Sequence, residues 1–262
     1  MRIRRGRRQV PLVPSNEETV GEMSAKVDRR RALAAFGTVG LGALLGCGSD
    51  REGSPTAVPT TEGGTATVEP RATPSRETAE LFGDESSCTL TPEQTEGPFY
   101  FDADAIRRDI REDRDGTPLR LAIRVRDAEC EPLPDAVVDI WHCDVGGSYS
   151  GFEAAEGERF LRGAQVTNRD GIVEFLTVYP GWYPGRTVHI HAKVHLDRST
   201  VLTTQLYFDD AVTDAVYARE PYSGRGERDQ RNDGDGIFDE ALVLDLSEDR
   251  DGYLGVISFD VA

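Results

Sequence analysis

The chain has 262 residues, of which 47 are acidic and 30 are basic, and its formal net charge is −17. The first 46 residues hold nine Lys/Arg and four Asp/Glu, a local charge of +5, which leaves −22 on the remainder. So acidic a remainder argues against nucleic acid or an anionic membrane as the partner of the folded part, because both would repel it. The length allows one large all-β domain or two ordinary domains.

The N-terminal region, residues 1–47, has the pattern of an export signal. The charged stretch 28–31 precedes a short apolar run at 32–46, an order typical of secretory signals. Its paired arginines resemble a twin-arginine signal, and Leu44-Leu45-Gly46-Cys47 resembles a lipobox. We therefore expect an exported, extracytoplasmic protein that touches the membrane only through a lipid anchor at Cys47. The alternative is a plain N-terminal membrane helix, although the run is short for one.

Residues 48–87 are rich in Ser, Thr, Pro, Gly and Glu and contain few large apolar side chains. Such a segment cannot bury enough surface to offset its ordering entropy, so we expect a disordered tether. The folded domain is then expected to occupy residues 88–262.

Four cysteines are present, and none forms a CxxC pair, which argues against a zinc ribbon. If Cys47 carries lipid, three remain, and these can form at most one disulfide. Cys88–Cys130 is our guess for that pair. The alternative is that Cys88, Cys130 and Cys143 are all free.

Segment 88–262 contains many short strand-like stretches separated by Gly/Pro turns. The clearest is 119–125, where apolar and polar side chains alternate. There is no alternation of strands and helices and no Gly-rich phosphate loop. We therefore predict an all-β fold, an antiparallel β-sandwich with long loops. Its expected strands are 119–125, 136–142, 172–178, 187–195, 203–208, 241–246 and 253–261.

Two charged segments are harder to interpret. Residues 104–113 are expected to form one helical turn or a loop. Residues 229–239, DQRNDGDGIFD, resemble a calcium-binding loop, but the spacing places Arg231 on a ligand position. We therefore favour an ordinary turn there.

Four histidines occur in the chain, and two of them, His189 and His191, project from the same face of a predicted strand. His195 has the same parity but would lie about 13 Å from His191, too far to share a metal ion. We place His195 at the surface or rim. His142, beside Trp141, is expected to be structural.

Two histidines do not complete a zinc site, which normally needs further His, Cys or carboxylate ligands. The chain instead offers two tyrosines near loops, Tyr149 and Tyr183. Phenolate is a hard anionic ligand that favours Fe(III) over Zn(II), and a ferric ion can keep tyrosine ionised at neutral pH. The alternative is a half-buried strand that happens to carry polar residues.

Four segments together resemble the intradiol ring-cleavage dioxygenases, and in particular the short, exported branch of that family. They are EGPFY at 96–100, WHCDVGGSYSGF at 141–152, PGWYPGRTVHIH at 180–191 and TTQLYF at 203–208. The similarity covers roughly residues 88–240. It implies a non-haem Fe(III) centre with Tyr149, Tyr183, His189 and His191 as metal ligands.

The resemblance also implies roles for further residues. Arg186 would stabilise negative charge that develops on the substrate, and Gln205 would orient substrate or O2. Tyr183 would leave the metal and accept a substrate proton. The reaction implied is cleavage of a small catechol-type diol by O2 to a muconate-type diacid. The alternatives are a surface cation for Arg186 and an ordinary strand hydrogen-bonding role for Gln205.

The chain departs from the family pattern in two places. Gly185 stands where the family often has Trp, which would open one wall of the pocket. The N-terminal helical region of the cytosolic members is absent, so its lipid-binding and dimer-forming roles are not expected. The rival functions are a catalytically inactive secreted binding module and a zinc hydrolase using His189 and His191. The identity of the diol and the oligomeric state stay open.

Overall fold

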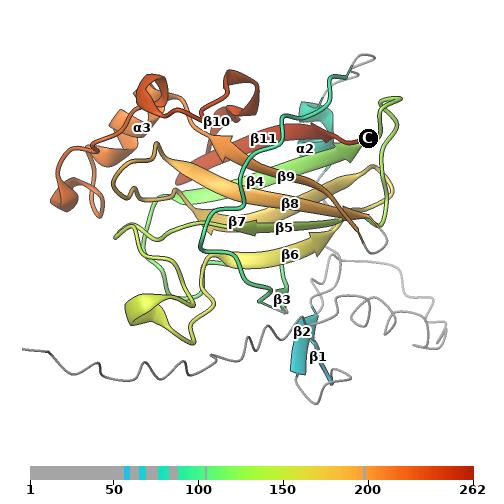
Figure 1. Cartoon of the computed structure of the whole chain (residues 1–262), viewed down its shortest axis with the longest axis horizontal. Coiled ribbons are helices and arrows are strands. Elements are labelled where there is room, and N and C mark those ends of the chain that lie inside the picture. Colours follow the sequence, from blue (N-terminus) through green and yellow to red (C-terminus); the bar gives the residue numbers. More distant parts are fainter. Residues whose placement is uncertain (1–55, 60–64, 69–75, 83–87, 104, 197–198) are drawn as a thin grey trace, which may run out of the picture.

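The computed structural model describes residues 56–59, 65–68, 76–82, 88–103, 105–196 and 199–262. The described residues form two packed β-sheets with a few short helices (Figure 1). The seven-stranded sheet has the order β1-β2-β3-β6-β5-β8-β9, and the four-stranded sheet has the order β10-β11-β4-β7. The strands are β1 Thr56–Pro59, β2 Thr65–Val68, β3 Ala105–Ile106, β4 Pro118–Arg126, β5 Val137–Trp141, β6 Arg162–Val166, β7 Ile172–Val178, β8 His189–Leu196, β9 Ser199–Tyr207, β10 Asp245–Asp249 and β11 Gly252–Asp260.

The helices are short and lie in the connections. α2 is Arg76–Leu81 and α3 is Asp210–Tyr217, and the 3₁₀ turns are η2 Glu153–Ala155, η3 Ser223–Arg225, η4 Asn232–Gly234 and η5 Glu240–Leu242. Among the described residues, no helix is long and apolar enough to cross a membrane. Residues 1–47, with the predicted signal and Cys47, lie outside the described part.

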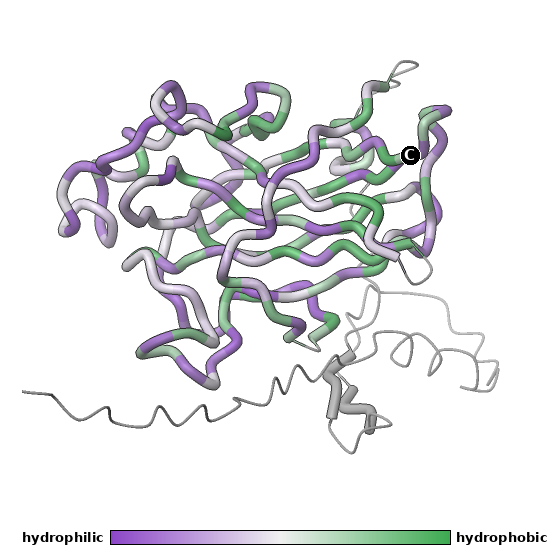
Figure 2. Tube along the Cα trace, viewed as in Figure 1, coloured by the Kyte–Doolittle hydropathy of each residue, from purple (hydrophilic) through white to green (hydrophobic). Residues whose placement is uncertain are grey.

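One core fills the space between the sheets. Alternate residues of each strand enter it, as Leu119, Leu121, Ile123 and Val125 do from β4, which confirms the predicted amphipathic strand. From β8 the core receives Ile190, Ala192 and Val194. The same alternation appears along the strands in Figure 2. Because side chains alternate, the other residues of β8, including both histidines, lie on the outer face of the seven-stranded sheet.

The all-β sandwich is confirmed, but the sheets are mixed rather than purely antiparallel. β11 pairs with β4 in parallel, with Tyr253 opposite Leu119, and β2–β3 and β3–β6 are parallel as well. β11 reaches β4 from the far end of the chain, so no hairpin forces the two strands to run in opposite directions.

Local structure differs from the expectations in detail. Within the segment expected to be a tether, residues 56–59 and 65–68 form β1 and β2, residues 76–81 form α2, and Phe82 packs on the four-stranded sheet against Ala122 and Leu254. The segment 104–113, expected to form one helical turn or a loop, is a loop in its described residues and contributes the two-residue strand β3 and a bridge to β7. The expected strand at 241–246 starts as the turn η5, because the side chain of Asp239 caps it at Ala241 N.

The disulfide guess is confirmed. Cys88 and Cys130 are bonded across a sequence separation of 42, and Cys143 is free and buried. This bond fastens the start of segment 88–103, which crosses the outer face of the seven-stranded sheet, to the turn after β4.

Candidate metal centre

The floor of the site is a row of side chains across four neighbouring strands. In the strand registers, Arg162 of β6 lies opposite Trp141 of β5, Trp141 lies opposite His191 of β8, and His191 lies opposite Gln205 of β9. Residues directly opposite one another share a face of the sheet. All four side chains are buried, although they lie on the outer face, because the loops of the site and segment 88–103 cover them.

Three potential donor atoms converge above this floor. The Nε2 atoms of His189 and His191 are 3.1 Å apart, and the Tyr183 hydroxyl is 3.1 Å from His189 Nε2. The ring of Tyr149 lies beside them, with its centroid 5.8 Å from that of Tyr183 and 6.1 Å from that of His191. The structure therefore brings together the four predicted ligand side chains, from one strand and two loops.

The protonation of His189 suits a metal ligand. Its Nδ1 donates to the carbonyl of Thr187 at 2.6 Å, which leaves a lone pair on Nε2. Burial, reinforced by Arg186, lowers the pKa of His189 to about 3, and burial with the neighbouring His189 lowers that of His191 well below its usual value. Both imidazoles are thus neutral at neutral pH, the form that binds metal.

Close packing of two glycines brings the two tyrosine loops together. A Cβ on Gly147 would lie 2.3 Å from the carbonyl oxygen of Trp182, and one on Gly181 would lie 2.3 Å from that of Asp144. Arg225 joins the same loops by donating from Nη1 to the carbonyls of Val145 and Trp182. Only glycine permits this close approach. The loop that carries Tyr149 and the turn that carries Tyr183 can therefore pack directly against each other.

The donor set fits a trivalent cation. Burial raises the pKa of Tyr149 well above its usual value and raises that of Tyr183. The Tyr149 hydroxyl is buried close to the hydroxyl of Tyr183, and it makes no hydrogen bond of ordinary geometry to the described residues. A bound cation of high charge would satisfy this hydroxyl and stabilise it as phenolate. Among the described residues, no group of three or more His, Cys, Asp or Glu side chains is placed to hold a metal ion.

Arg186 and Gln205, the other predicted site residues, contact each other. Arg186 Nη2 donates to Gln205 Oε1 at 2.6 Å, and Arg186 Nε donates to Asp235 Oδ2 at 2.8 Å. Burial alone would lower the pKa of Arg186, but the carboxylate of Asp235 outweighs it and keeps the guanidinium charged. Arg186 is therefore a half-buried cation beside the histidines and not a surface residue.

Two residues near the site went unpredicted. Asp235 lies in the loop that we expected to be an ordinary turn. Arg162 is buried beside Tyr149, where its Nε and Nη2 donate to Ser150 and its guanidinium carbon lies 5.9 Å from the ring centroid of Tyr149. Burial lowers the pKa of Arg162 to about 10, so it remains charged at neutral pH. Arg162 thus adds a fixed positive charge to the floor of the site.

The remaining histidines lie outside the donor set. His142 is fully buried and forms two hydrogen bonds, from Nδ1 to the carbonyl of Cys143 at 2.8 Å and between Nε2 and the hydroxyl of Thr177 at 2.7 Å. These contacts support the predicted structural role. His195 is half-buried near the end of β8, where the hydroxyl of Thr200 bonds to its Nδ1. Neither contacts the converging Nε2 atoms.

Comparison with known proteins gives consistent matches. Residues 95–223 match the family model described as Dioxygenase. The intradiol ring-cleavage dioxygenase from Tetranychus urticae is 34% identical with a TM-score of 0.64, over 66% of this chain and 95% of that chain. The dioxygenase domain of a dioxygenase–carbohydrate-binding protein fusion from Streptomyces sp. SirexAA-E is 35% identical with a TM-score of 0.53, over 66% and 97%.

Curated relatives match over shorter shares of their length. Catechol 1,2-dioxygenase of Acinetobacter baylyi is 30% identical over 200 residues, which is 61% of this chain and 62% of that protein. The chain spans about half the length of the curated relatives it matches.

Proposed function

Because this chain belongs to the intradiol ring-cleavage dioxygenase family, we propose that it is a non-haem Fe(III) enzyme that cleaves catechol-type diols with O2. Both atoms of O2 would enter the product, a muconate-type diacid. The observation that carries the proposal is the convergence of two neutral histidine Nε2 atoms and the Tyr183 hydroxyl, with the buried Tyr149 hydroxyl beside them.

In this proposal Tyr149, Tyr183, His189 and His191 hold the iron. When bound, Fe(III) would supply the redox chemistry and the positive charge that let O2 react with the aromatic ring. The protein's part is to hold the diol, to move its protons and to exclude water.

Tyr183 is the residue suited to move a proton. It lies on a turn, is only half-buried, and bonds through its hydroxyl to His189 Nε2. As a phenolate it would accept a proton from one hydroxyl of the incoming diol. Tyr149 is held more firmly, because Phe99 stacks on its ring at a centroid distance of 4.5 Å. We assign Tyr149 the role of a permanent ligand and Tyr183 that of the exchangeable one.

Arg186 and Gln205 are placed to interact with the oxygen atoms of a bound diol. The guanidinium of Arg186 is fixed by Gln205 and Asp235 before any substrate arrives. A fixed charge of this kind stabilises negative charge on a bound diolate without reorganisation during the reaction. Segment 96–101, with Phe99 over the site, would exclude water.

The test is a visible spectrum of the purified protein together with metal analysis and an O2-uptake assay with catechol. We expect one iron per chain, a broad tyrosinate-to-iron charge-transfer band, and one O2 consumed per ring opened. Substitution of Tyr149 or Tyr183 by Phe should shift or remove the band. A protein that takes up no iron and shows no band would support the alternative of an inactive binding module.

We also propose that the enzyme is exported and anchored at the membrane surface through lipidated Cys47. The Cys88–Cys130 disulfide supports an extracytoplasmic location, because disulfides persist in oxidising compartments. Fractionation of expressing cells tests this proposal. The wild-type protein is expected in the membrane fraction and Cys47→Ala in the soluble exported fraction, and equal distribution of the two would contradict it.

A further inference from the structure

The acidic loop 229–239 places one buried carboxylate at the site. Asp235 Oδ2 accepts two hydrogen bonds, from Arg186 Nε at 2.8 Å and from the backbone N of Thr187 at 2.9 Å. Its Oδ1 accepts from the backbone N of Ile237 at 3.1 Å. One carboxylate thus holds both the arginine of the site and the residue whose carbonyl accepts from His189 Nδ1.

The Asp235 contact determines which atoms of Arg186 remain available. Nε is occupied by Asp235, and Nη2 is occupied by Gln205 Oε1 and lies 3.5 Å from the Tyr207 hydroxyl. Nη1 has no hydrogen-bond partner among the described residues, and the side chain is 20% exposed. The two fixed edges of the planar guanidinium set its orientation, so Nη1 is the nitrogen left for a ligand.

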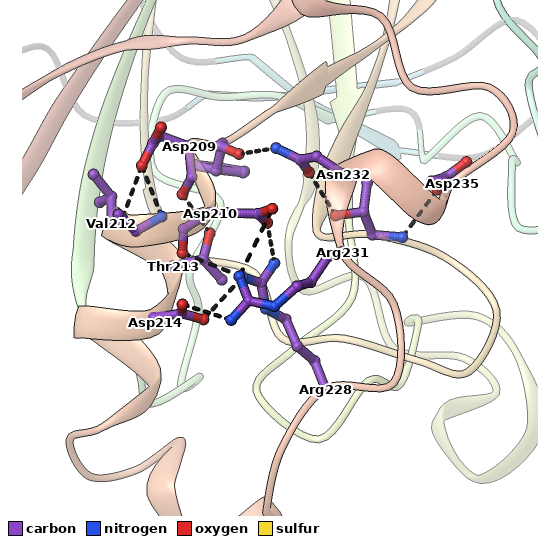
Figure 3. A network of polar contacts seen from close by, with 12 residues as sticks. Asp209, Asp210, Val212, Thr213, Asp214, Arg228, Arg231, Asn232 and Asp235 are labelled. Atoms are coloured by element: carbon purple, nitrogen blue, oxygen red, sulfur yellow. Dashed lines mark hydrogen bonds and ion pairs between the residues drawn. The ribbon is translucent and has the colours of Figure 1, made fainter.

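The loop that carries Asp235 is itself well anchored. Asn232 accepts from the hydroxyl of Thr187 at 2.7 Å and donates to the carbonyl of Phe208 at 2.8 Å. Arg228, just before the loop, pairs with Asp210 and Asp214 of α3, and Arg231, within it, pairs with Asp214 (Figure 3). These contacts tie the loop to α3, so Asp235 is held in a fixed place instead of meeting Arg186 by chance.

We infer that Asp235 is a positioning residue for the reaction, which orients Arg186 toward the bound diol and does not itself touch substrate or metal. The inference rests on the proposed function, in which Arg186 stabilises charge on the diolate. Loop 229–239 resembles a calcium-binding loop in sequence, but in this inference it supports the catalytic centre. Its buried carboxylate, Asp235, binds the guanidinium of Arg186.

The chain offers a matched control for the test. Asp233 belongs to the same loop and is exposed. It forms no ion pair among the described residues, and it acts on Arg231 only through longer-range electrostatic attraction. Asp235→Asn and Asp233→Asn therefore make the same change of charge at a buried and at an exposed position. Asp235→Glu, which keeps the charge but lengthens the side chain, is a second variant if Asp235→Asn does not fold.

With catechol as the probe, we expect Asp235→Asn to lower kcat roughly 10- to 100-fold, the scale of a displaced catalytic group. Asp235→Glu should fall between Asp235→Asn and the wild type, and Asp233→Asn should match the wild type. Iron content and the charge-transfer band should not change in any of the three, because Asp235 is not a ligand. Wild-type kcat in both Asp235 variants would overturn the inference.

A double-mutant cycle separates positioning from general support of the fold. If Asp235 acts through Arg186, adding Asp235→Asn to Arg186→Gln should lower kcat no further. Multiplicative losses would show that Asp235 acts by another route and would overturn the inference.

A crystal structure of Asp235→Asn tests the positioning without turnover. We expect Arg186 to leave Gln205 Oε1, and retention of the 2.6 Å contact would overturn the inference. An inactive wild type would instead refute the proposed function, and this structural readout would still stand.

Discussion

Trp141 stacks on the imidazole of His191, with ring centroids 4.9 Å apart and planes only 5° apart. The two residues lie opposite each other on β5 and β8, so the sheet itself sets this contact. The indole covers one face of the imidazole and restricts rotation of the ring about its χ2 angle. Trp141 therefore fixes the direction in which His191 Nε2 points.

The first prediction follows from this stacking. Trp141→Leu removes the flat surface and should weaken iron binding roughly 10- to 100-fold, as the loss of an orienting partner does at other metal sites. Trp141→Phe keeps an aromatic face and should lose less. The measurement is iron retained during titration with a competing chelator. Equal iron retention by Trp141→Leu and the wild type would contradict the orienting role.

The second prediction concerns the close contact at Gly147. Gly157, which has nearly the same backbone φ angle, serves as the control. Gly147 has φ +84° and Gly157 has φ +87°, so alanine is strained at both. A Cβ at Gly147 meets the Trp182 carbonyl at 2.3 Å, whereas one at Gly157 meets nothing within 4 Å. Gly147→Ala should therefore lose the charge-transfer band and ring cleavage, while Gly157→Ala should lose only a little stability.

Thermal unfolding of both glycine variants provides the check. If Gly157→Ala lost the band as well, the backbone strain and not the contact between the two tyrosine loops would be responsible.

The third prediction concerns pH. Burial lowers the pKa of His142 to about 4 and that of His189 to about 3, from an ordinary value of 6.5. Below 6.5 the unfolded chain binds protons that the folded chain does not, so stability is complete above 6.5 and falls as pH drops toward the folded-state values. Each histidine contributes a slope of up to about 1.4 kcal/mol per pH unit.

Denaturant unfolding of the metal-free protein across this pH range measures the slope. His142→Gln removes one titrating group outside the donor set, so its slope should be shallower than that of the wild type. Equal slopes would mean that His142 does not titrate on unfolding.

The fourth prediction concerns the disulfide. Cys88 and Cys130 are separated by 42 residues, and closing a loop of that size in the unfolded chain contributes about 4 kcal/mol to stability. Cys88→Ser/Cys130→Ser should lose about this amount in denaturant unfolding. A reducing agent should lower the stability of the wild type to that of the variant and leave the variant unchanged. A variant as stable as the oxidised wild type would contradict the prediction.

Local geometry predicts part of the convergence seen at the site. Two histidines separated by one residue share a strand face wherever that strand pairs, and the Pro/Gly turn holds Tyr183 beside them. The place of Tyr149 follows from the resemblance to the family. The partners of Arg186 could not be predicted in this way. Asp235 is 49 residues away from it in sequence, and nothing in an acidic Gly-rich loop indicates which cation it will meet.

The missed elements have physical explanations as well. β6, RGAQV, has no apolar alternation, because polar residues are buried on both of its faces: Arg162 lies under the loops of the site, and Gln165, paired with Val138, faces the space between the sheets. A rule that expects apolar side chains in buried positions fails where a sheet face is buried by a functional site. α3 is only eight residues long, and its start depends on Asp209, whose side chain caps Ala211 N and Val212 N.

The row formed by Arg162, Trp141, His191 and Gln205 draws one residue from each of four strands. A slip of one residue in any of these pairings would turn the affected side chain to the opposite face. Under the proposed function, such a molecule would lose the charge-transfer band of the iron site even if it remained compact. The intensity of that band per chain would then report the fraction of molecules whose strands have paired in the correct register.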